Sequence, residues 1–409
     1  MAKSNQTSPK KFLKAKDFDL VRDRVPVENY TSQKIFEEER DKVFRPSWLY
    51  VGRESEVLDK GSYFTRDLPT LKTSIIVVRG DDQVIRAFHN SCSHRGVSVA
   101  ESGCGKARTF RCPYHAWVYK NNGQLINVPC ENDFPQIDKE RHGLKSLSIA
   151  SWNGFIFVNL DEKPKQSLDE FLGEFGVTYD GVPFDQYPYS FRVVLPIECN
   201  WKSMIDAFSE GYHLSFLHEK TLKDQTATAE NPFIHYLDPR FMGLHQVATL
   251  ERNYEWVPTE PVQVFVLNTM PASHTLDLSN NNKLASIMEH PGVNPSNVVN
   301  FSADNATVFP NLQIQFMVNG YLTHQFWPVA PDKMIMETRI YSATKPKTFR
   351  EKFASAYIQS SARDVVTEDS SMSVLQQKGL TSGGNEYIYF GENELMLRKF
   401  ADVLAEYID

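Results

Sequence analysis

The sequence predicts an α+β protein, with a small unit of short antiparallel strands followed by a larger unit of mixed strands and helices. From about residue 73 to about residue 160, short β-rich runs alternate with turn signals. Beyond Pro164, runs typical of both strands and helices occur, and a long helical region covers roughly 348–378. At 409 residues the chain is long enough for two domains, or for one large domain with a smaller one inserted.

The N-terminal region predicts little regular structure before its first helix. Residues 1–20 are polar, and we expect them to form a mobile arm. Residues 31–44 predict a helix with Thr31 or Ser32 as its N-cap and an apolar stripe along one side.

The β-rich unit is predicted from three pairs of strand-like runs, each pair separated by turn residues. The pairs are 73–78 with 83–89, 116–119 with 124–128, and 146–151 with 154–160.

The rest of the chain predicts two helices and several strands. The helices are expected at 200–217 and at 348–378, with Gly379 as the C-cap of the second. Residues 271–305 are rich in Asn, Ser and Pro and predict a loop or lid. The strands are expected near 242–250, 261–268, 312–318 and 333–343.

Composition and charge exclude several classes of protein. The net charge of −7 provides no basic field, so we expect no nucleic-acid partner. No apolar stretch approaches the roughly 20 residues of a membrane-spanning helix, and no secretory signal is visible. Five cysteines, an odd number, argue against a disulfide scaffold and for a reducing, cytoplasmic compartment.

Two cysteine–histidine corners lie inside the β-rich unit. Cys92 and His94 form the first, and Cys112 and His115 form the second, with 17 residues between His94 and Cys112. Two turns of this kind can bring two thiolates and two imidazoles together, a ligand set typical of a Rieske [2Fe–2S] cluster. A structural zinc site would normally have its cysteines and histidines in separate pairs, and chance rarely produces two matched corners. We interpret the other cysteines as small buried hydrophobic residues; they are Cys104, Cys130 and Cys199.

The segments CSHRG and CPYHAWVY resemble the cluster-binding loops of Rieske ring-hydroxylating oxygenase large subunits. In this family glycine is more usual at the position of Ala116. The resemblance implies that the cluster is held by Cys92, His94, Cys112 and His115.

A second group of candidate ligands begins at Asn200-Trp201-Lys202 and includes His213 and His218. Iron sites that activate O₂ use two histidines and one carboxylate on one face. Residues five apart on a regular helix are separated by about 140°, so a bulge or helix end near 214–217 would be needed to bring the rings together. Taken alone, two unrelated surface histidines would be the better interpretation.

The segment NWK…EGYHLSFLH is similar to the iron-binding segment of the same family, which implies that His213 and His218 are iron ligands. The family's third ligand is an aspartate in a late helix that ends in Gln-x-Gly-Leu, and Asp369 matches that position. Asp364 lacks this spacing and is interpreted as a solvated charge. Asp206 stands where many relatives carry asparagine; it is either a partner of the iron site or an ordinary helix residue.

The resemblance extends over nearly the whole chain. It implies an N-terminal arm and helix at 1–45 that pack with the catalytic domain, a Rieske domain at 46–162, and a catalytic domain at 163–409. The Rieske domain would be inserted in the larger domain, which would have an antiparallel sheet flanked by helices. The implied cofactors are the cluster and a mononuclear Fe(II), with electrons from NAD(P)H through a separate reductase, with or without a ferredoxin.

The implied activity is that of a terminal oxygenase that mono- or dioxygenates an apolar, aromatic or polycyclic substrate. An oxidative demethylase or monooxygenase of a quaternary amine or a methylated small molecule is the alternative, because dioxygenases usually carry aspartate where this chain has Glu210. An electron-transfer protein without oxygenase activity is the rival from another class. The apolar residues considered for the pocket are Phe241, Met242, Leu244, Phe309, Leu312, Ile314, Phe316, Met317, Leu322, Phe326 and Trp327.

Glu210 and His213 are three residues apart, so on a helix they would occupy neighbouring faces. The family resemblance implies that this carboxylate bridges His213 to His115 of a neighbouring subunit, because the two metals of one chain are too far apart. A head-to-tail homotrimer, with or without a β subunit, is therefore expected.

Overall fold

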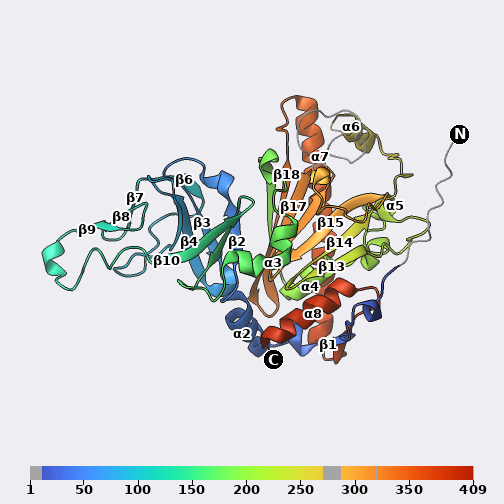
Figure 1. Cartoon of the computed structure of the whole chain (residues 1–409), viewed down its shortest axis with the longest axis horizontal. Helices are drawn as coiled ribbons and strands as arrows, with labels where there is room; N and C mark the ends of the chain where they lie inside the picture. The colour runs from blue at the N-terminus through green and yellow to red at the C-terminus, as the bar shows by residue number, and fades with distance from the viewer. Residues whose placement is uncertain (1–11, 270–286, 319, 409) are drawn as a thin grey trace. The chain divides into compact units, whose positions relative to one another are not determined.

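The computed structural model describes residues 12–269, 287–318 and 320–408 (Figure 1). The chain divides into two compact units: Glu37–Gly176 forms the smaller one, and the described residues of Met1–Phe36 and Val177–Asp409 form the larger. In the sequence, the smaller unit is thus inserted in the larger. The helical stretch expected at 31–44 is divided between the units after Phe36.

The smaller unit contains a seven-stranded antiparallel sheet and a three-stranded one. The strands of the first, in spatial order, are β2 (Leu49–Arg53), β11 (Phe155–Asn159), β10 (Ser146–Trp152), β5 (Ile85–His89), β4 (Thr73–Arg79), β3 (Ser62–Leu68) and β6 (Cys104–Lys106). The strands of the second are β7 (Thr109–Arg111), β8 (Val118–Lys120) and β9 (Leu125–Asn127). The three predicted strand pairs correspond to β4 with β5, β8 with β9, and β10 with β11.

Local sequence explains the β10–β11 hairpin. Its two-residue turn consists of Asn153 and Gly154, which both adopt left-handed conformations, with φ of 45° and 74°. An Asn-Gly pair tolerates positive φ at both positions, so it suits the tight turn whose twist matches antiparallel strands.

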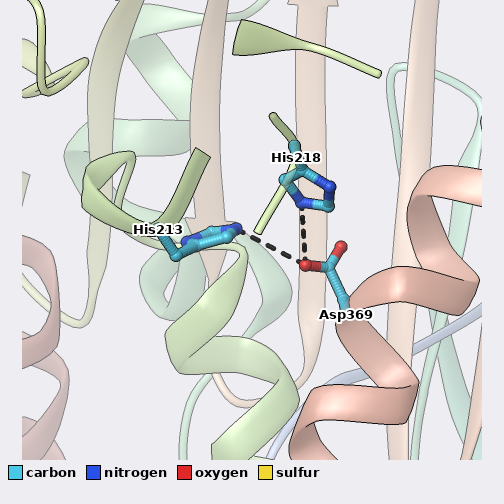
Figure 2. Close-up of side chains that lie close together, drawn as sticks. All are labelled: His213, His218 and Asp369. Carbon is cyan, nitrogen blue, oxygen red and sulfur yellow. Dashed lines mark hydrogen bonds and ion pairs between the residues drawn. The ribbon is translucent and has the colours of Figure 1, made fainter. Parts of the chain in front are cut away.

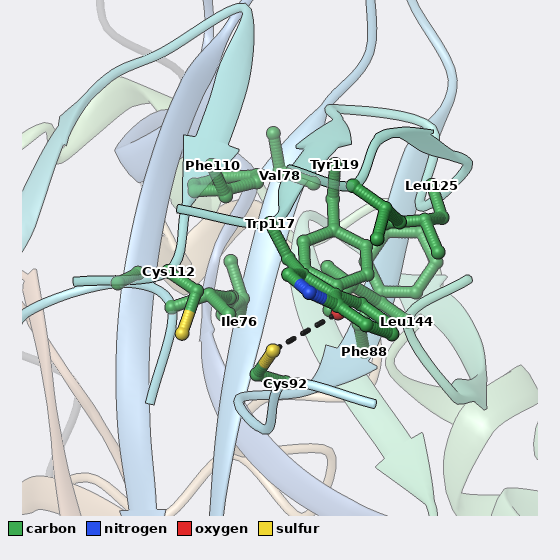
Figure 3. Packing of buried hydrophobic residues seen from close by; sticks show 13 residues of the cluster. Ile76, Val78, Phe88, Cys92, Phe110, Cys112, Trp117, Tyr119, Leu125 and Leu144 are labelled. Atoms are coloured by element: carbon green, nitrogen blue, oxygen red, sulfur yellow. Dashed lines mark hydrogen bonds between the residues drawn. The ribbon is translucent and has the colours of Figure 1, made fainter. Parts of the chain in front are cut away.

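Figure 3 shows the apolar core of this unit, in which Trp117 and Tyr119 belong to the same cluster as Phe88.

The larger unit is built on a second seven-stranded antiparallel sheet. Its strands, in spatial order, are β12 (Tyr189–Ile197), β18 (Lys333–Ser342), β17 (Gly320–Ala330), β16 (Leu312–Met317), β15 (Phe301–Val308), β14 (His245–Glu251) and β13 (Leu237–Met242). A separate two-stranded sheet consists of β1 (Arg24–Pro26) and β19 (Tyr387–Tyr389).

Helices pack against this sheet and against one another, so the predicted α+β class is confirmed. Helix α4 contacts both α7 and β17, and α8 contacts β13 and β14. Within the described ranges, no helix combines the length and the apolar character needed to cross a bilayer. The helices are α1 (Glu28–Thr31), α2 (Gln33–Glu38), α3 (Leu168–Thr178), α4 (Trp201–Ala207), α5 (Lys223–Thr226), α6 (Pro261–Thr269), α7 (Phe349–Thr381) and α8 (Leu395–Ile408). A π-helical segment, Glu39–Phe44, follows α2.

Helix α7 begins at a capping box. Thr348 Oγ1 accepts from Glu351 N at 3.2 Å, and the Glu351 carboxylate accepts from Thr348 N at 2.8 Å. The helix continues through Gly379, so the prediction of Gly379 as its C-cap was wrong. Ser382 is the C-cap, and Gly383, with φ of 77°, takes the left-handed position beyond it.

Three other predictions of local structure need correction. Residues 261–268 belong to helix α6 rather than to a strand. Proline at the first helical position favours a helix. The helix also packs on α7, where the ring centroids of Phe265 and Phe353 lie 5.5 Å apart. A short apolar run alone does not distinguish the two structures. The predicted loop at 271–305 is wrong at its end, because β15 begins at Phe301. The first part of that loop, and residues 1–11 of the predicted arm, lie outside the described residues. The prediction of a mobile arm was wrong for residues 12–20, which contain a 3-10 helix, Ala15–Asp17, and bury Ala15 and Leu20 against Leu395.

The helix predicted at 200–217 is also wrong in its extent, because α4 ends at Ala207. Asn200 caps its start by accepting from Lys202 N at 3.0 Å. Beyond its end the chain closely approaches the carbonyl of Ile234: a Cβ atom added to the buried Gly211 would lie 2.0 Å from Ile234 O. Glycine permits this approach, which constrains the path of the chain into the histidine segment.

We predict that Gly211→Ala destabilises the protein by about 1–3 kcal/mol, the usual cost of an overpacked buried contact. The measurement is thermal unfolding, together with the iron content of the purified protein. Gly379→Ala is the matched control, since no described heavy atom outside the adjoining helix backbone lies within 4 Å of its added Cβ and alanine stabilises a helix interior. Equal stability of the two variants would show that the Gly211 contact does not constrain the chain.

Candidate metal centres

The two cysteine–histidine corners of the smaller unit share one backbone arrangement. In the first, Gly96 N donates to Cys92 O at 2.8 Å; in the second, Ala116 N donates to Cys112 O at 3.1 Å. Gly96 and Ala116 both adopt left-handed conformations, with φ of 76° and 57°. The corners therefore match although their Cys–His spacings differ, and Ala116 adopts a conformation that glycine would favour.

The side chains of these corners fit a metal cluster. Cys92 and Cys112 are buried in the apolar core, and both are free thiols (Figure 3). The rings of His94 and His115 have centroids 4.6 Å apart, and the Nδ1 atom of each is buried without a hydrogen-bond partner among the described residues. Buried polar atoms normally have a partner, so these two nitrogens are suited to binding a metal. Two thiols and two such nitrogens are the donor set of a Rieske [2Fe–2S] cluster.

A tyrosine that sequence reasoning missed also reaches this site. Tyr119 Oη lies 3.1 Å from Cys92 Sγ and accepts from Ser93 N at 2.9 Å. Hydrogen bonds to cluster sulfurs influence the reduction potential, so Tyr119 is placed to do so here. Tyr119 is the last residue of the CPYHAWVY segment, but the segment does not reveal its contact, which joins β8 to the other corner.

The remaining cysteines were predicted to be buried. This is correct for Cys199 but wrong for Cys104 and Cys130, which are exposed. Cys104 lies in β6, at the edge of its sheet, and Cys130 lies in a turn with φ of 54°. Both positions are set by the fold rather than by the hydrophobic character of the residue.

In the larger unit His213, His218 and Asp369 converge on one point. Each offers a ligand atom, and these atoms lie within 4.8 Å of one another (Figure 2). Asp369 Oδ1 is 3.0 Å from His218 Nε2 and 3.4 Å from His213 Nε2. Two imidazoles and one carboxylate on one face are the donor set of a mononuclear iron that activates O₂. Asp364, by contrast, is exposed and forms an ion pair with Arg363 at 3.4 Å.

The other ring nitrogen of each histidine is bonded to a glutamate. Glu210 Oε1 is the partner of His213 Nδ1, and Glu368 Oε2 lies 2.6 Å from His218 Nδ1. Thr221 Oγ1 donates to the same Glu368 oxygen at 2.8 Å. Such carboxylates orient histidines that bind metals and strengthen them as ligands. Sequence reasoning missed Glu368, whose signal is its position directly before Asp369.

Electrostatics at this site also favour a bound cation. Burial disfavours the charged ring of His213, but hydrogen bonds with Asp369 and Glu210 raise its pKa to about 10. Burial likewise opposes ionisation of Asp369, yet its hydrogen bonds with both histidines hold its pKa below the usual value. Positive charge is thus stabilised between these groups, and a metal ion would compete with protons for the place.

Both histidines lie beyond the end of α4, which resolves the problem of their five-residue spacing. His213 lies in a 3-10 turn, Tyr212–Ser215, and Leu217 N donates to His213 O at 2.8 Å. Glu210 also lies outside the helix, so its expected placement on the same helix as His213 was wrong. Glu210 reaches His213 through this irregular segment, and it also accepts from His213 N at 3.2 Å.

Asp206, near the end of α4, interacts away from the histidines. Its carboxylate accepts from Tyr30 Oη at 2.5 Å. Burial raises the pKa of Asp206 to about 7, against the effects of the Tyr30 hydrogen bond and the nearby Lys202 charge. The contact joins α4 to α1 and does not involve the three convergent side chains directly.

A cavity of about 290 Å³ includes the three convergent side chains in its wall. The sheet supplies Leu250, Leu322 and Ile340, and α7 supplies Val365 and Val366. A cavity of this size suits a small organic ligand. Of the apolar residues considered from the sequence, Leu322 is in the wall, whereas others belong to the core of the sheet.

Each of the two units matches the model of a known protein family. The sequence model described as "Ring hydroxylating alpha subunit (catalytic domain)" matches residues 184–409, and the one described as "Rieske [2Fe-2S] domain" matches 47–146. The chain is 34% identical over 197 residues to the carnitine monooxygenase oxygenase subunit of Escherichia coli (strain K12), covering 47% of this chain and 52% of that protein. It is 34% identical over 203 residues to the benzene 1,2-dioxygenase subunit alpha of Pseudomonas putida, covering 48% and 44%.

The matched segment thus spans about half the length of these curated relatives. A likeness in fold extends further. The crystal structure of a quaternary ammonium Rieske monooxygenase superposes with a TM-score of 0.75 and 22% sequence identity, covering 98% of this chain and 100% of that one.

We predict that Asp369→Ala loses the mononuclear iron and keeps the spectrum of the cluster, since the two sites share no candidate ligand. Asp364→Ala is the matched control on the same helix and should retain both. The measurements are iron content and the absorption spectrum of the purified variants. The assignment of the carboxylate is wrong if Asp364→Ala loses iron while Asp369→Ala keeps it.

Proposed function

Because the chain belongs to the family of ring-hydroxylating oxygenase alpha subunits and carries a Rieske domain, we propose that it is the terminal oxygenase of a multicomponent system. It takes electrons that originate from NAD(P)H, through a separate reductase with or without a ferredoxin, and uses O₂ to oxygenate an organic substrate. The convergence of His213, His218 and Asp369 on the wall of a cavity is the observation that carries this proposal. A protein that only transfers electrons does not require a second metal site or a cavity large enough for a substrate.

The residues that would hold the two cofactors follow from the geometry. When bound, these groups supply electron storage and O₂ activation, chemistry that protein side chains lack. Glu210 and Glu368 would keep the imidazoles of the iron site oriented. The cluster would be held by two thiols and two imidazoles, those of Cys92, His94, Cys112 and His115. The mononuclear iron would be held by His213, His218 and Asp369.

The wall of the cavity supports a substrate with a largely apolar body. Branched aliphatic side chains from the sheet and from α7 line the same space as the three convergent residues. Aromatic and polycyclic molecules fit such a wall. Demethylation of a quaternary amine is the second candidate, favoured by the similarity to the carnitine monooxygenase subunit.

We further propose that Glu210 connects the two metal centres across a subunit boundary in a homotrimer, with or without a β subunit. Glu210 contacts His213 directly, and exposed aromatic residues lie close to it in the sequence: Tyr212 and Phe216 are 51% and 59% exposed. In the smaller unit Tyr114, next to His115, is 56% exposed. Exposed aromatic side chains are typical of surfaces that become buried between subunits.

The loaded protein should be brown, contain three irons per chain and, after reduction, show the low-average-g EPR signal of a Rieske cluster. His115→Ala should abolish that signal, because it removes one of the cluster's nitrogen donors. With a reductase and NAD(P)H, ¹⁸O₂ should label the product. Two irons per chain without O₂ consumption would indicate an electron carrier, and a colourless protein with bound zinc would refute the cluster.

We predict that Glu210→Gln retains both metals but slows oxidation of the prereduced cluster by at least about tenfold, because the carboxylate beside His213 is lost. Single-turnover kinetics measure this rate, and sedimentation measures the assembly, expected to be a trimer. Glu219→Gln is the control, since its side chain is 68% exposed and pairs with Lys223. Wild-type rates in Glu210→Gln, or a fully active monomer, would refute the bridging role.

A further inference from the structure

A pair of polar side chains belongs to the part of the cavity wall that the sheet provides. His324 on β17 and Thr338 on β18 lie directly opposite each other in the sheet, and both line the cavity that contains the candidate iron ligands. Leu322 and Ile340, two residues away along the same strands, form the next pair on the same face. A few polar groups in a wall with apolar neighbours are typical of groups that orient a bound ligand.

The surroundings of His324 hold its ring in place. His324 Nδ1 lies 2.9 Å from Thr338 Oγ1, and the ring centroid of Phe208 lies 4.5 Å from that of His324. His324 is 3% exposed. Its other ring nitrogen, Nε2, has no hydrogen-bond partner among the described residues but is not fully enclosed by protein atoms, so it borders the cavity.

The imidazole of His324 is neutral. Burial lowers the pKa of His324 to about 3, against the effect of the nearby Asp369 charge. At physiological pH the ring therefore carries one hydrogen, on Nδ1 or on Nε2.

The pair of His324 and Thr338 has one hydrogen more than its mutual hydrogen bond uses. If Thr338 donates to Nδ1, the free hydrogen is on Nε2; if Nδ1 donates to Thr338, the free hydrogen is on Oγ1. Both residues line the cavity, and the described part of the chain provides no second hydrogen-bond partner for either side chain. Because a shielded donor without an acceptor costs free energy, a ligand that supplies the acceptor is favoured. This conclusion holds for both tautomers of the ring.

We propose that the substrate is a hydrocarbon molecule that bears a carbonyl oxygen, and that this oxygen accepts the free hydrogen of the pair formed by His324 and Thr338. The inference rests on the proposed oxygenase function and names the substrate class of that same site. Because the pair is fixed on the sheet, the hydrogen bond would determine which part of the substrate faces His213, His218 and Asp369. Thr338 is a positioning residue where it acts through the ring of His324.

The proposal distinguishes between substrate classes. A plain arene or alkane leaves the free hydrogen of the pair unpaired. A site that pairs with a polar group of its ligand discriminates against the analogue that lacks this group. The pair has no net charge, so it recognises an acceptor oxygen and does not require an ionised substrate.

The test is calorimetric binding to the cluster- and iron-loaded protein, with ketones paired to the hydrocarbons of the same skeleton. The pairs are indanone with indane, tetralone with tetralin, and acetophenone with ethylbenzene. At least one ketone should bind about 2- to 10-fold more tightly than its hydrocarbon, the usual net effect of a hydrogen bond between neutral groups.

Variants of the two residues assign this preference to the pair. His324→Phe keeps an aromatic ring but removes the donor. It should weaken ketone binding about 5- to 100-fold, because a buried carbonyl is left without a partner, and change hydrocarbon binding by less than about twofold. His324→Gln retains an N–H donor and should keep part of the preference. Thr338→Val should reduce the preference, and Thr338→Ser, which retains the hydroxyl, should preserve it.

His290→Phe is the matched control, since it makes the same exchange outside the wall of the cavity. The ring of His290 is bonded to Asp180 O at 2.8 Å, and its replacement should leave the ratio of ketone to hydrocarbon affinity unchanged. Iron content and thermal unfolding check that each variant is folded. If His324→Phe is not folded, the comparison of Thr338→Val with Thr338→Ser decides the question.

The proposal is overturned if no ketone binds better than its hydrocarbon, or if the preference survives in folded His324→Phe. It is also overturned if the preference is lost in Gln315→Met, a variant of an amide in the same wall, and kept in His324→Phe. Failure of the oxygenase function would be seen separately, as the absence of O₂ consumption with any member of the panel. A ketone preference that depends on the pair without O₂ consumption would support the binding site and refute the reaction.

Discussion

The meeting of helix α7 with the segment 213–218 is the interaction on which the larger unit's site depends. Glu368 and Asp369, consecutive on α7, contact the two nitrogens of His218 at 2.6 and 3.0 Å. Farther along the same helix, Gln377 Oε1 accepts from Asn200 N at 2.8 Å, at the start of α4. One helix thus contacts the chain both before and within the histidine segment. A shift of α7 by one turn, about 5.4 Å, would separate the proposed ligands.

Irregular backbone makes this meeting possible. A regular helix through 213–218 would direct the two rings apart, and the chain avoids this by ending α4 at Ala207. The close approach of Gly211 to Ile234 then constrains the segment that leads to the histidines. In the smaller unit irregular backbone also positions candidate ligands, since left-handed residues close both cysteine–histidine corners. In each unit histidines among the candidate ligands lie on turns, next to regular strands or helices.

The two candidate centres differ in the hydrogen-bond partners of their histidine ring nitrogens. In the smaller unit His94 and His115 keep a buried Nδ1 without a partner among the described residues, as expected for nitrogens that bind a metal. In the larger unit both nitrogens of His213 and His218 have carboxylate partners. The glutamates can remain in place when a cation replaces the shared protons.

Local patterns were sufficient to predict the family, the α+β class and the two cofactors, because each cluster corner spans only a few residues and the strand pairs are hairpins. Tertiary structure decided what depends on distant contacts: the end of α4, the helical form of 261–269, the exposure of two cysteines, and the pairing of Glu368 with His218, 150 residues apart in the sequence. Arg252 lines the cavity, and it could not be assigned to the cavity from the sequence. An arginine at a strand end is expected to be solvated unless other elements enclose it, and here the cavity walls come from the sheet and from α7.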